Sequence, residues 1–384
     1  MMLTRLLSAS RSILAVLIVL LSVASVGRAS AFETPARAAI LVDLQSDQIL
    51  FAKNPDEPLP PASMSKLMTA FMVFERLEEG QLSLDDTFPV SEKAWRKGGS
   101  KMFVEVDSRV RVEDLLRGII IQSGNDACIV VAEALAGSEE AFAEQMTARA
   151  RELGLTHTTL KNASGWPDPE HLMSVRDLAT LAKTLIERFP NYYTLYSEKE
   201  FTYNGNRQYS RNPLLHRESG ADGLNTGYTD EAGYGLVASA VRDGRRLVMV
   251  LAGLQRPGER AREAERLLEY GYQQFKSYQL FSAGEAVEQA GVWLGNEATV
   301  PLVLERDVVI SLTPEGRRNL EVRVIYDGPV PAPVAKGARI AELEIVAPGI
   351  EPRRLPLIAS EEVRAANLLN RVTSALGYLI WGPS

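Results

Sequence analysis

The sequence predicts an α+β fold followed by a small all-β domain, and three observations support this prediction. Several segments between residues 66 and 188 have the spacing of amphipathic helices, and two strand-like segments follow at 234–240 and 246–254. From about residue 280, short β-branched segments separated by Gly and Pro replace this pattern. A chain of 384 residues with 46% hydrophobic content can form two cores of this kind.

Apolar spacing, turns and caps place the elements before residue 280. A β-hairpin is expected over residues 36–53, and the strands at 234–240 and 246–254 flank a turn at Asp243-Gly244. Ser174 is expected to cap the helix at 175–188, with Asp177 completing a capping box. A helix begins at Asp126 with Asn125 or Asp126 as its cap, and further helices are expected at 67–77, 112–121, 141–153 and 261–275.

The segments after residue 280 predict a small β-sandwich. Its expected strands are 298–304, 308–312, 320–326, 341–346 and 354–357. We therefore expect a first domain at 32–276, a β-rich domain at 281–359 and a tail at 360–384.

The N-terminus has the order of a secretory signal peptide. Arg5 and Arg11 precede an apolar run at 13–23, and Ala29-Ser30-Ala31 follows. We expect cleavage after Ala31, so that residues 1–31 are removed. The alternative is an uncleaved anchor, which the short apolar run and the Ala-x-Ala ending disfavour.

The C-terminal tail regains helical spacing over residues 360–381. Its apolar stripe consists of Leu368, Val372, Leu376 and Leu379, with Ile380 and Trp381 beside it. Such a helix can lie in a membrane interface or pack on its own domain, and we expect the membrane surface as its partner.

Composition argues against several function classes. The net charge is −7 and the sequence pI about 5.3, so nucleic acid is not an expected partner. Cys128 is the only cysteine and lies in an apolar segment, which predicts a buried structural thiol. The histidines, His157, His171 and His216, have no metal-binding spacing, so we expect no metal or cofactor.

Ser63-Met64-Ser65-Lys66 is the segment that points most directly to chemistry. It stands at the start of a predicted helix, where this spacing puts the Ser63 hydroxyl and the Lys66 amine on one face. A desolvated lysine amine can take the serine proton and so activate the hydroxyl as a nucleophile. Taken alone, the pattern is better explained by two ordinary polar residues on an amphipathic helix.

Two further segments favour the interpretation of Ser63 and Lys66 as a catalytic pair. Ser123-Gly124-Asn125 falls in a break between two predicted helices, and Asn225-Thr226-Gly227 comes just before the predicted strand pair. Each could be a simple turn or cap. All three motifs in this order, each in the expected local structure, match the trio described for serine β-lactamases and penicillin-binding proteins.

The chain resembles the low-molecular-mass penicillin-binding proteins that act as D-alanyl-D-alanine carboxypeptidases. The resemblance covers residues 36–275 and includes the segments 162–165, 174–177 and 211–215. It implies a β-lactamase/transpeptidase-like antiparallel sheet flanked by helices, with a helical subdomain. The β-rich domain and tail resemble the C-terminal domain and membrane anchor of the same group. The resemblance thus implies an exported, periplasmic enzyme, peripheral on the outer face of the cytoplasmic membrane.

The resemblance also implies catalytic roles. Ser63 would attack the carbonyl of the penultimate D-alanine of a peptidoglycan stem peptide, and Lys66 would accept its proton. Ser123 would relay a proton to the leaving amine, and Asn125 would hold the substrate amide. Water would then hydrolyse the acyl-enzyme, whereas β-lactams such as penicillins would acylate Ser63 and leave slowly.

The third motif is implied to bind substrate. Thr226 would hold the terminal carboxylate, with Asn225 and Gly227 beside it. The backbone N–H groups of Ser63 and Tyr228 would form the oxyanion hole.

Asn225 departs from the family pattern, which has a cation at this position. Asparagine can donate a hydrogen bond to the substrate but brings no charge, and charge-assisted hydrogen bonds are about twice as strong as neutral ones. Losing one partner of a buried charged pair costs about 2–5 kcal/mol. We expect Asn225 to impair carboxypeptidase activity more than the fold. Arg211 or Arg207 are the candidates to supply the missing charge.

Three alternatives stand beside the carboxypeptidase. Asn225 favours a catalytically weakened protein that binds peptidoglycan or penicillin, and a DD-endopeptidase acting on cross-linked peptides also fits. A β-lactamase using Asp168 or Glu170 is disfavoured, because Met173 stands where class A enzymes have Asn. We expect these two acids in a solvated loop and His171 on the surface.

Overall fold

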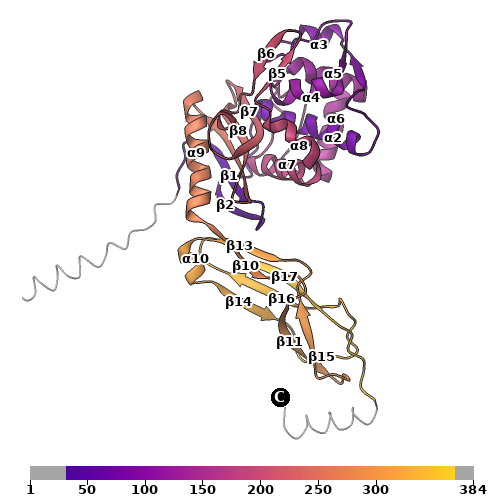
Figure 1. Ribbon diagram of the computed structural model, residues 1–384, viewed down its shortest axis with the longest axis vertical. Helices are drawn as coiled ribbons and strands as arrows, with labels where there is room; N and C mark the ends of the chain where they lie inside the picture. The colour runs from indigo at the N-terminus through magenta and orange to yellow at the C-terminus, as the bar shows by residue number, and fades with distance from the viewer. Residues whose placement is uncertain (1–31, 368–384) are drawn as a thin grey trace, which may run out of the picture. The chain divides into compact units, whose positions relative to one another are not determined.

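The computed structural model describes residues 32–367, and the expected signal peptide lies outside this range. A five-stranded antiparallel sheet forms the centre of the first domain (Figure 1). Its order is β2-β1-β9-β8-β7, so that β2 and β7 are the edges. The strands are β1 Ala38–Asp43, β2 Gln48–Lys53, β7 Ala221–Thr229, β8 Gly233–Arg242 and β9 Arg245–Leu254.

Helices cover both faces of this sheet. Side chains alternate along β1, so Ile40 joins the large core on one face while Leu41 lies against Gly271 of α9 on the other. Figure 1 shows α9 on one side of the sheet and α7 and α8 on the other. These helices span α7 Val175–Arg188, α8 Pro190–Tyr193 and α9 Pro257–Gln274.

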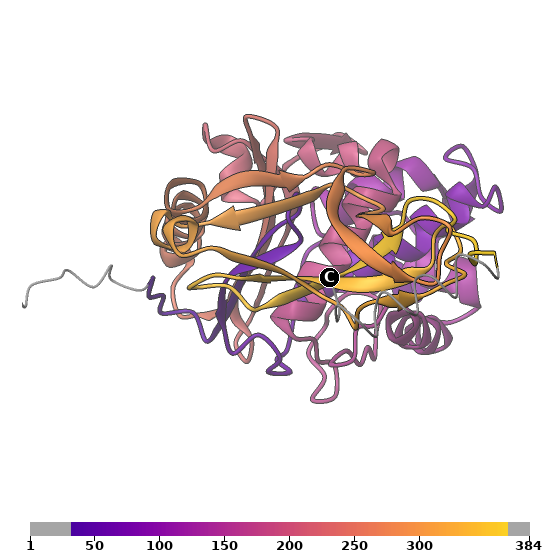
Figure 2. The ribbon, with the colours of Figure 1, turned by 90° about the horizontal axis from the view of Figure 1, so that it is seen from below.

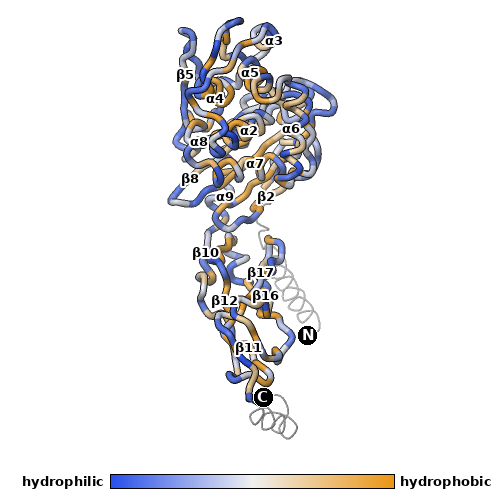
Figure 3. Tube along the Cα trace, turned by 90° about the vertical axis from the view of Figure 1, so that its right-hand side faces the viewer, coloured by the Kyte–Doolittle hydropathy of each residue, from blue (hydrophilic) through white to orange (hydrophobic). Residues whose placement is uncertain are grey.

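A helical subdomain forms between β2 and β7 in the sequence. Helix α2 lies at its centre and is buried on nearly all sides, as expected for a helix that is apolar all round. Hydrophobic stretches concentrate in α2, α4 and α5, while the connecting loops are hydrophilic (Figure 3). The elements are α2 Lys66–Glu78, α3 Glu92–Arg96, α4 Val112–Ile120, α5 Asn125–Ala136, α6 Glu139–Glu152, and the hairpins β3 Thr87–Pro89 with β4 Arg109–Arg111 and β5 Glu200–Tyr203 with β6 Asn206–Tyr209.

The second domain is built from strands, with one short helix (Figure 2). Strands β10 and β13 pair, and a six-stranded sheet has the order β14-β16-β17-β12-β11-β15. Leu302, Ile310, Leu343 and Leu357 belong to one core, which joins the two sheets. The elements are β10 Lys276–Phe281, β11 Ala286–Trp293, β12 Thr299–Val303, β13 Val308–Leu312, α10 Pro314–Arg318, β14 Glu321–Ile325, β15 Val330–Pro331, β16 Arg339–Val346 and β17 Arg353–Ala359.

Two capping predictions were wrong in part. Helix α5 begins at Asn125, and the residue in the N-cap position is Gly124, which has no side chain to cap the helix. Neither Asn125 nor Asp126 is therefore the N-cap. The Asp126 carboxylate instead accepts the backbone N–H groups of the 102–104 loop. Ser174 caps α7 as predicted, but the Asp177 carboxylate accepts hydrogen bonds from residues 157 and 158 rather than closing a capping box.

The tail differs from the prediction where it is described. Residues 360–367 are extended instead of helical, because Val363 bridges to Val334 and Ala365 to Gly295 on the second domain. The predicted apolar stripe from Leu368 to Trp381 lies outside the described residues. Within 32–367, none of the helices combines the length and apolar character needed to span a membrane.

Candidate active site

Ser63 and Lys66 lie next to each other at the start of α2. A short 3₁₀ helix, η1 (Ala62–Ser65), runs directly into α2, whose first residue is Lys66. The Lys66 Nζ lies 2.8 Å from the Ser63 Oγ and donates a second hydrogen bond of 2.6 Å to the carbonyl oxygen of Ser164. The two side chains therefore form the serine–amine pair that the motif predicts.

The Lys66 amine is held in a dry environment. Its side chain is almost fully buried, and this burial lowers the pKa of Lys66 to about 8. The positive charges of Arg211 and Lys97 lower the pKa further, whereas Cys128 and Asp126 oppose the shift. A substantial fraction of Lys66 is consequently neutral near pH 8 and can accept a proton.

The second motif brings a free hydroxyl to the same place. Ser123 has a φ of 62°, a left-handed conformation that is uncommon for a residue other than glycine. Its Oγ is buried and has no hydrogen-bond partner among the described residues. Asn125 donates its Nδ2 to the carbonyl oxygen of Gly98 at 3.0 Å, which fixes its side chain at the wall of the site.

The third motif precedes the strand pair β8–β9, as the sequence predicts, but it lies inside a further strand, the edge strand β7, which was not predicted. Asn225 donates its Nδ2 to the Ser63 carbonyl oxygen at 3.0 Å, and its Oδ1 accepts the Thr226 N–H at 2.8 Å. Asn225 therefore ties β7 to the residue that carries the hydroxyl. Tyr228 is half exposed at the end of the motif, and its ring stacks on Tyr234 of β8.

Two glycines allow these segments to approach η1. A Cβ on Gly165, which has a φ of 74°, would lie 1.9 Å from the Ala62 carbonyl oxygen. A Cβ on Gly227 would lie 2.7 Å from the Pro61 carbonyl oxygen. Only glycine permits both contacts without backbone movement.

A cleft of about 610 Å³ joins the motifs. Its walls include Ser63, Ser123, Asn125, Thr226, Gly227 and Tyr228, together with Ser164 and Trp166. Lys66 lies beneath Ser63, and Asn225 contacts the site through its bond to Ser63. The structure thus gathers all eight residues selected from the sequence.

Two arginines bring positive charge to the cleft. Arg211 lines it and donates to the Ser100 Oγ. Arg260 of α9 also lines it, and its buried Nε has no hydrogen-bond partner within residues 32–367. Arg207 does not line it and pairs with Glu200 on the exposed β5–β6 hairpin. Arg260 carries no local sequence pattern that could have identified it, and neither does the carbonyl of Ser164.

Two other predictions concerned single residues. Cys128 is fully buried, as predicted, and burial raises the pKa of its thiol to about 12. His171 is buried rather than on the surface, and it lines a second pocket beside the cleft. In the described part of the chain, no group of three His, Cys, Asp or Glu side chains is placed to hold a metal ion.

Family models match both domains of the chain. A model described as D-alanyl-D-alanine carboxypeptidase, peptidase family S11, matches residues 25–255. A second, described as penicillin-binding protein 5, C-terminal domain, matches residues 275–365.

Characterised relatives align over nearly the full chain. D-alanyl-D-alanine carboxypeptidase DacC of Escherichia coli is 36% identical over 345 residues, covering 88% of this chain and 86% of the relative. DacF of Bacillus subtilis is 31% identical and covers 91% of each chain.

Solved structures share the fold. Penicillin-binding protein 5 of Haemophilus influenzae superposes with a TM-score of 0.81 at 33% identity, over 87% of this chain and 99% of the other. The ampicillin-bound form of penicillin-binding protein D2 of Listeria monocytogenes superposes with a TM-score of 0.58 at 30% identity, over 63% of this chain and 99% of the other. The predicted α+β sheet with its helical subdomain and all-β C-terminal domain is thereby confirmed.

Proposed function

The chain belongs to the D-alanyl-D-alanine carboxypeptidase family of serine peptidases, and from this premise we propose that it removes the terminal D-alanine of peptidoglycan stem pentapeptides through a Ser63 acyl-enzyme. The observation that carries this assignment is the 2.8 Å contact between the Ser63 Oγ and the buried Lys66 Nζ. A serine next to a neutral amine in a cleft is equipped for nucleophilic acyl transfer.

The first half of the reaction forms the acyl-enzyme. Neutral Lys66 accepts the hydroxyl proton as the Ser63 Oγ bonds to the carbonyl carbon of the penultimate D-alanine. The carbonyl oxygen becomes an oxyanion that the N–H groups of Ser63 and Tyr228 stabilise. The amide bond then breaks, and the proton held by Lys66 passes through the Ser123 hydroxyl to the leaving amine of the terminal D-alanine, which leaves Lys66 neutral again.

The second half regenerates the enzyme. A water molecule gives a proton to the base and attacks the ester carbonyl. The bond between the acyl carbon and the Ser63 Oγ then breaks, the base returns its proton to that Oγ, and the shortened peptide leaves with a carboxylate. β-Lactams would enter through the first half and stall before the second, which agrees with the ampicillin-bound structural relative.

The free edge of β7 supports binding of an extended peptide. An edge strand leaves backbone groups available for a strand from another molecule. With the terminal carboxylate at Thr226 and the scissile carbonyl at the Tyr228 N–H, the substrate runs antiparallel to β7. Its upstream residues then pass Thr229.

Arg211 and Arg260 compensate for the charge that Asn225 lacks. Both guanidinium groups line the cleft, and both are protonated at neutral pH. The buried Nε of Arg260 has no hydrogen-bond partner in the described part of the chain, so a substrate carboxylate would satisfy it. This supports an active enzyme over a protein that only binds its ligand.

Intact mass after incubation with benzylpenicillin tests the nucleophile. The parent protein should gain the mass of one penicillin, and Ser63→Ala should gain none. Release of D-alanine from a pentapeptide stem, measured on the same samples, tests turnover. Absence of the adduct on the parent protein would reject Ser63 as the nucleophile.

Asn225 gives the weakened binding protein a specific test. Hydrogen bonds to charged groups contribute about 1.5–3 kcal/mol, so Arg260→Gln should lower kcat/KM for D-alanine release about tenfold or more. Asn225→Lys should raise kcat/KM for D-alanine release by a smaller factor than the factor by which Arg260→Gln lowers it. If the parent releases no D-alanine while Asn225→Lys does, the binding-protein alternative is correct. Cross-linked dimeric peptides assayed alongside would reveal endopeptidase activity.

The proposed setting is outside the cytoplasm. Residues 1–31 would direct export, and the tail at 360–384 would hold the enzyme on the outer face of the cytoplasmic membrane. Cell fractionation of the full chain and of a chain ending at Asn367, which keeps the bridges of Val363 and Ala365 to the second domain, tests the anchor. Equal membrane recovery of both forms would exclude it.

A further inference from the structure

The two faces of strand β7 carry different parts of the third motif. Side chains alternate along a strand, so those of Asn225 and Thr226 lie on opposite faces. The face of Asn225 meets η1, because Asn225 donates to the Ser63 carbonyl oxygen. Thr226 shares the other face with Tyr228, and both residues line the cleft. A group that assists Thr226 in binding a ligand is therefore expected on this second face.

Tyr234 and Arg260 lie on the second face. Tyr234 of β8 is the cross-strand partner of Tyr228, and the two rings stack with their centroids 4.2 Å apart and an interplanar angle of 25°. The guanidinium group of Arg260, which belongs to α9, lies 5.8 Å from the centroid of the Tyr234 ring. These three side chains, which we call the Arg260 stack, line the cleft together with Thr226.

Arg260 differs from the neighbouring arginines of α9. The arginine at the N-cap and the two that follow Arg260 pair with glutamates of the same helix, as Arg256–Glu259, Arg262–Glu263 and Arg266–Glu263. Within residues 32–367, Arg260 forms no such ion pair, and its buried Nε makes no hydrogen bond. Its positive charge therefore lies against an aromatic ring instead of a carboxylate.

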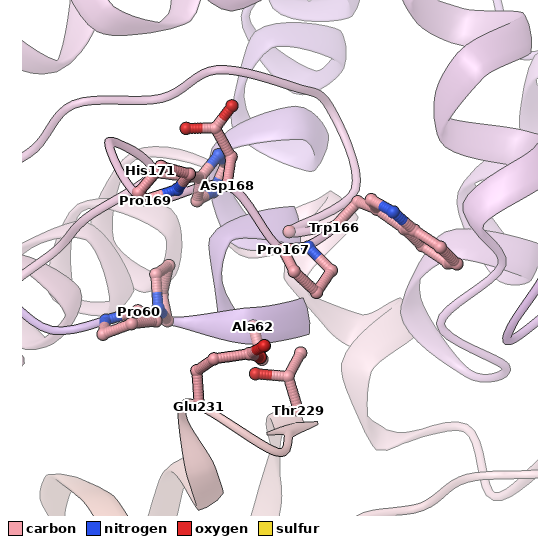
Figure 4. A pocket seen from close by; sticks show the side chains of 11 residues that line it. Pro60, Ala62, Trp166, Pro167, Asp168, Pro169, His171, Thr229 and Glu231 are labelled. Carbon is pink, nitrogen blue, oxygen red and sulfur yellow. The ribbon is translucent and has the colours of Figure 1, made fainter.

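The acids of the turn after β7 also leave Arg260 without an ion pair in the described part of the chain. The Asp230 carboxylate accepts the Tyr228 hydroxyl at 2.7 Å, and this bond raises the pKa of Tyr228 to about 12, so the hydroxyl stays protonated. Figure 4 shows the Glu231 side chain turned toward Ala62, at the second pocket beside the cleft. The Arg260 stack thus presents an unneutralised cation to the cleft.

The Tyr234 ring is suited to hold this cation in place. An arginine side chain has several rotatable bonds, and fixing them only when a ligand arrives weakens binding. A guanidinium group within about 6 Å of an aromatic centroid is attracted to the ring, and more strongly where water is excluded. Contact with a ring also leaves the N–H groups of Arg260 available for a two-point bond to a carboxylate.

We propose that Tyr234 is a positioning residue for substrate binding, which holds the Arg260 guanidinium where the terminal carboxylate lies beside Thr226. Tyr228 supports Tyr234 by stacking on it. A cation at position 225 would be carried by β7 itself, whereas the charge of Arg260 comes from a helix and needs the ring to place it. This inference rests on the proposed carboxypeptidase function and goes beyond it, because Tyr234 acts through Arg260.

A peptide and its C-terminal amide test this role. N-acetyl-L-Ala-D-Ala-D-Ala ends in a carboxylate, whereas the same peptide ending in D-alaninamide has none. Tyr234→Leu should lower kcat/KM for the acid about three- to thirtyfold, mainly through a higher KM. It should change kcat/KM for the amide by less than about twofold, since Arg260 then has no carboxylate to bind. Tyr234→Phe keeps the ring and should stay within about twofold of the parent for both peptides.

Tyr209→Leu is the matched control. Tyr209 also has an arginine over its ring, Arg207 at 5.3 Å, but this pair is exposed on the β5–β6 hairpin and does not line the cleft. Its loss should leave the rates for both peptides unchanged. Benzylpenicillin titration of Ser63 counts the folded sites in each preparation, and Tyr234→Met replaces Tyr234→Leu if the latter does not fold.

A double variant tests whether Tyr234 acts through Arg260. Tyr234→Leu combined with Arg260→Gln should be no slower on the acid than Arg260→Gln alone. Equal losses for acid and amide after correction for folded sites, a Tyr234→Phe variant as slow as Tyr234→Leu, or additive losses in the double variant would each overturn the inference.

The parent protein and Arg260→Gln separate this inference from the proposed function. If the parent releases D-alanine and Arg260→Gln slows this release but Tyr234→Leu does not, only the role of Tyr234 fails. If the parent forms no benzylpenicillin adduct and releases no D-alanine, the proposed function itself fails, and the inference falls with it.

Discussion

At the residue scale, Lys66 determines when Ser63 can react. Both hydrogen bonds of its amine go to oxygen atoms, one on Ser63 and one on Ser164, and no carboxylate pairs with it in the described structure. Desolvation therefore dominates its pKa, which falls to about 8 instead of staying near its usual value. By burying Lys66, the fold provides an amine that is partly neutral near pH 8 and can act as a base, whereas an exposed lysine would stay protonated at this pH.

The pH profile of the reaction should report this base. Lys66 can accept a proton only when neutral, so kcat/KM for D-alanine release should fall about tenfold per pH unit below about 8 and level off above it. His171 does not produce this limb, because burial lowers its pKa to about 4 and it stays neutral throughout. Initial rates between pH 6 and 9.5 measure the profile.

Lys66→Arg provides the control for that profile. Its guanidinium stays protonated over the whole range, so D-alanine release should be lost at every pH. A parent profile that is flat between pH 6 and 9 would show that proton transfer to Lys66 does not limit the reaction.

At the element scale, the sequence predicted best those elements that bury an apolar face. Helix α7 has the predicted bounds, and α4 ends one residue earlier than expected. Strand β7 was missed, because its sequence Ala-Asp-Gly-Leu-Asn-Thr-Gly-Tyr-Thr lacks the usual alternation. One edge of β7 serves the cleft, so chemistry rather than core packing selects several of its residues.

The same reasoning explains which parts of the site could be predicted. Ser63 and Lys66 are close in sequence on one helix face, so local spacing was sufficient to pair them. Arg260 reaches the cleft, and His171 the second pocket beside it, only through tertiary packing of α9 and of the 162–171 loop. Neither has a local pattern, and the surface position predicted for His171 was wrong for that reason.

At the scale of the whole molecule, a buried polar cluster joins the two domains. Asp43, at the end of β1, is fully buried and pairs with the Arg245 Nε at 2.8 Å. Ser311 of β13 donates its hydroxyl to the same carboxylate and its N–H to the Gln48 Oε1. Arg245 also donates to the carbonyl of Phe275, the residue before the second domain's first strand. The residues that hold β13 of the second domain against the first domain thus also stabilise strands β1 and β9 of the five-stranded sheet.

Arg245→Met should therefore destabilise the protein strongly. It leaves the Asp43 carboxylate buried without its cation, and breaking a buried pair in this way costs about 3–5 kcal/mol. Arg207→Met is the matched control, since its pair with Glu200 is exposed and should contribute less than about 1 kcal/mol. Adding Asp43→Asn to Arg245→Met should recover part of the loss, because the unpaired charge is then gone. Urea unfolding of the four proteins measures these differences, and equal losses for Arg245→Met and Arg207→Met would mean that the cluster does not stabilise the molecule.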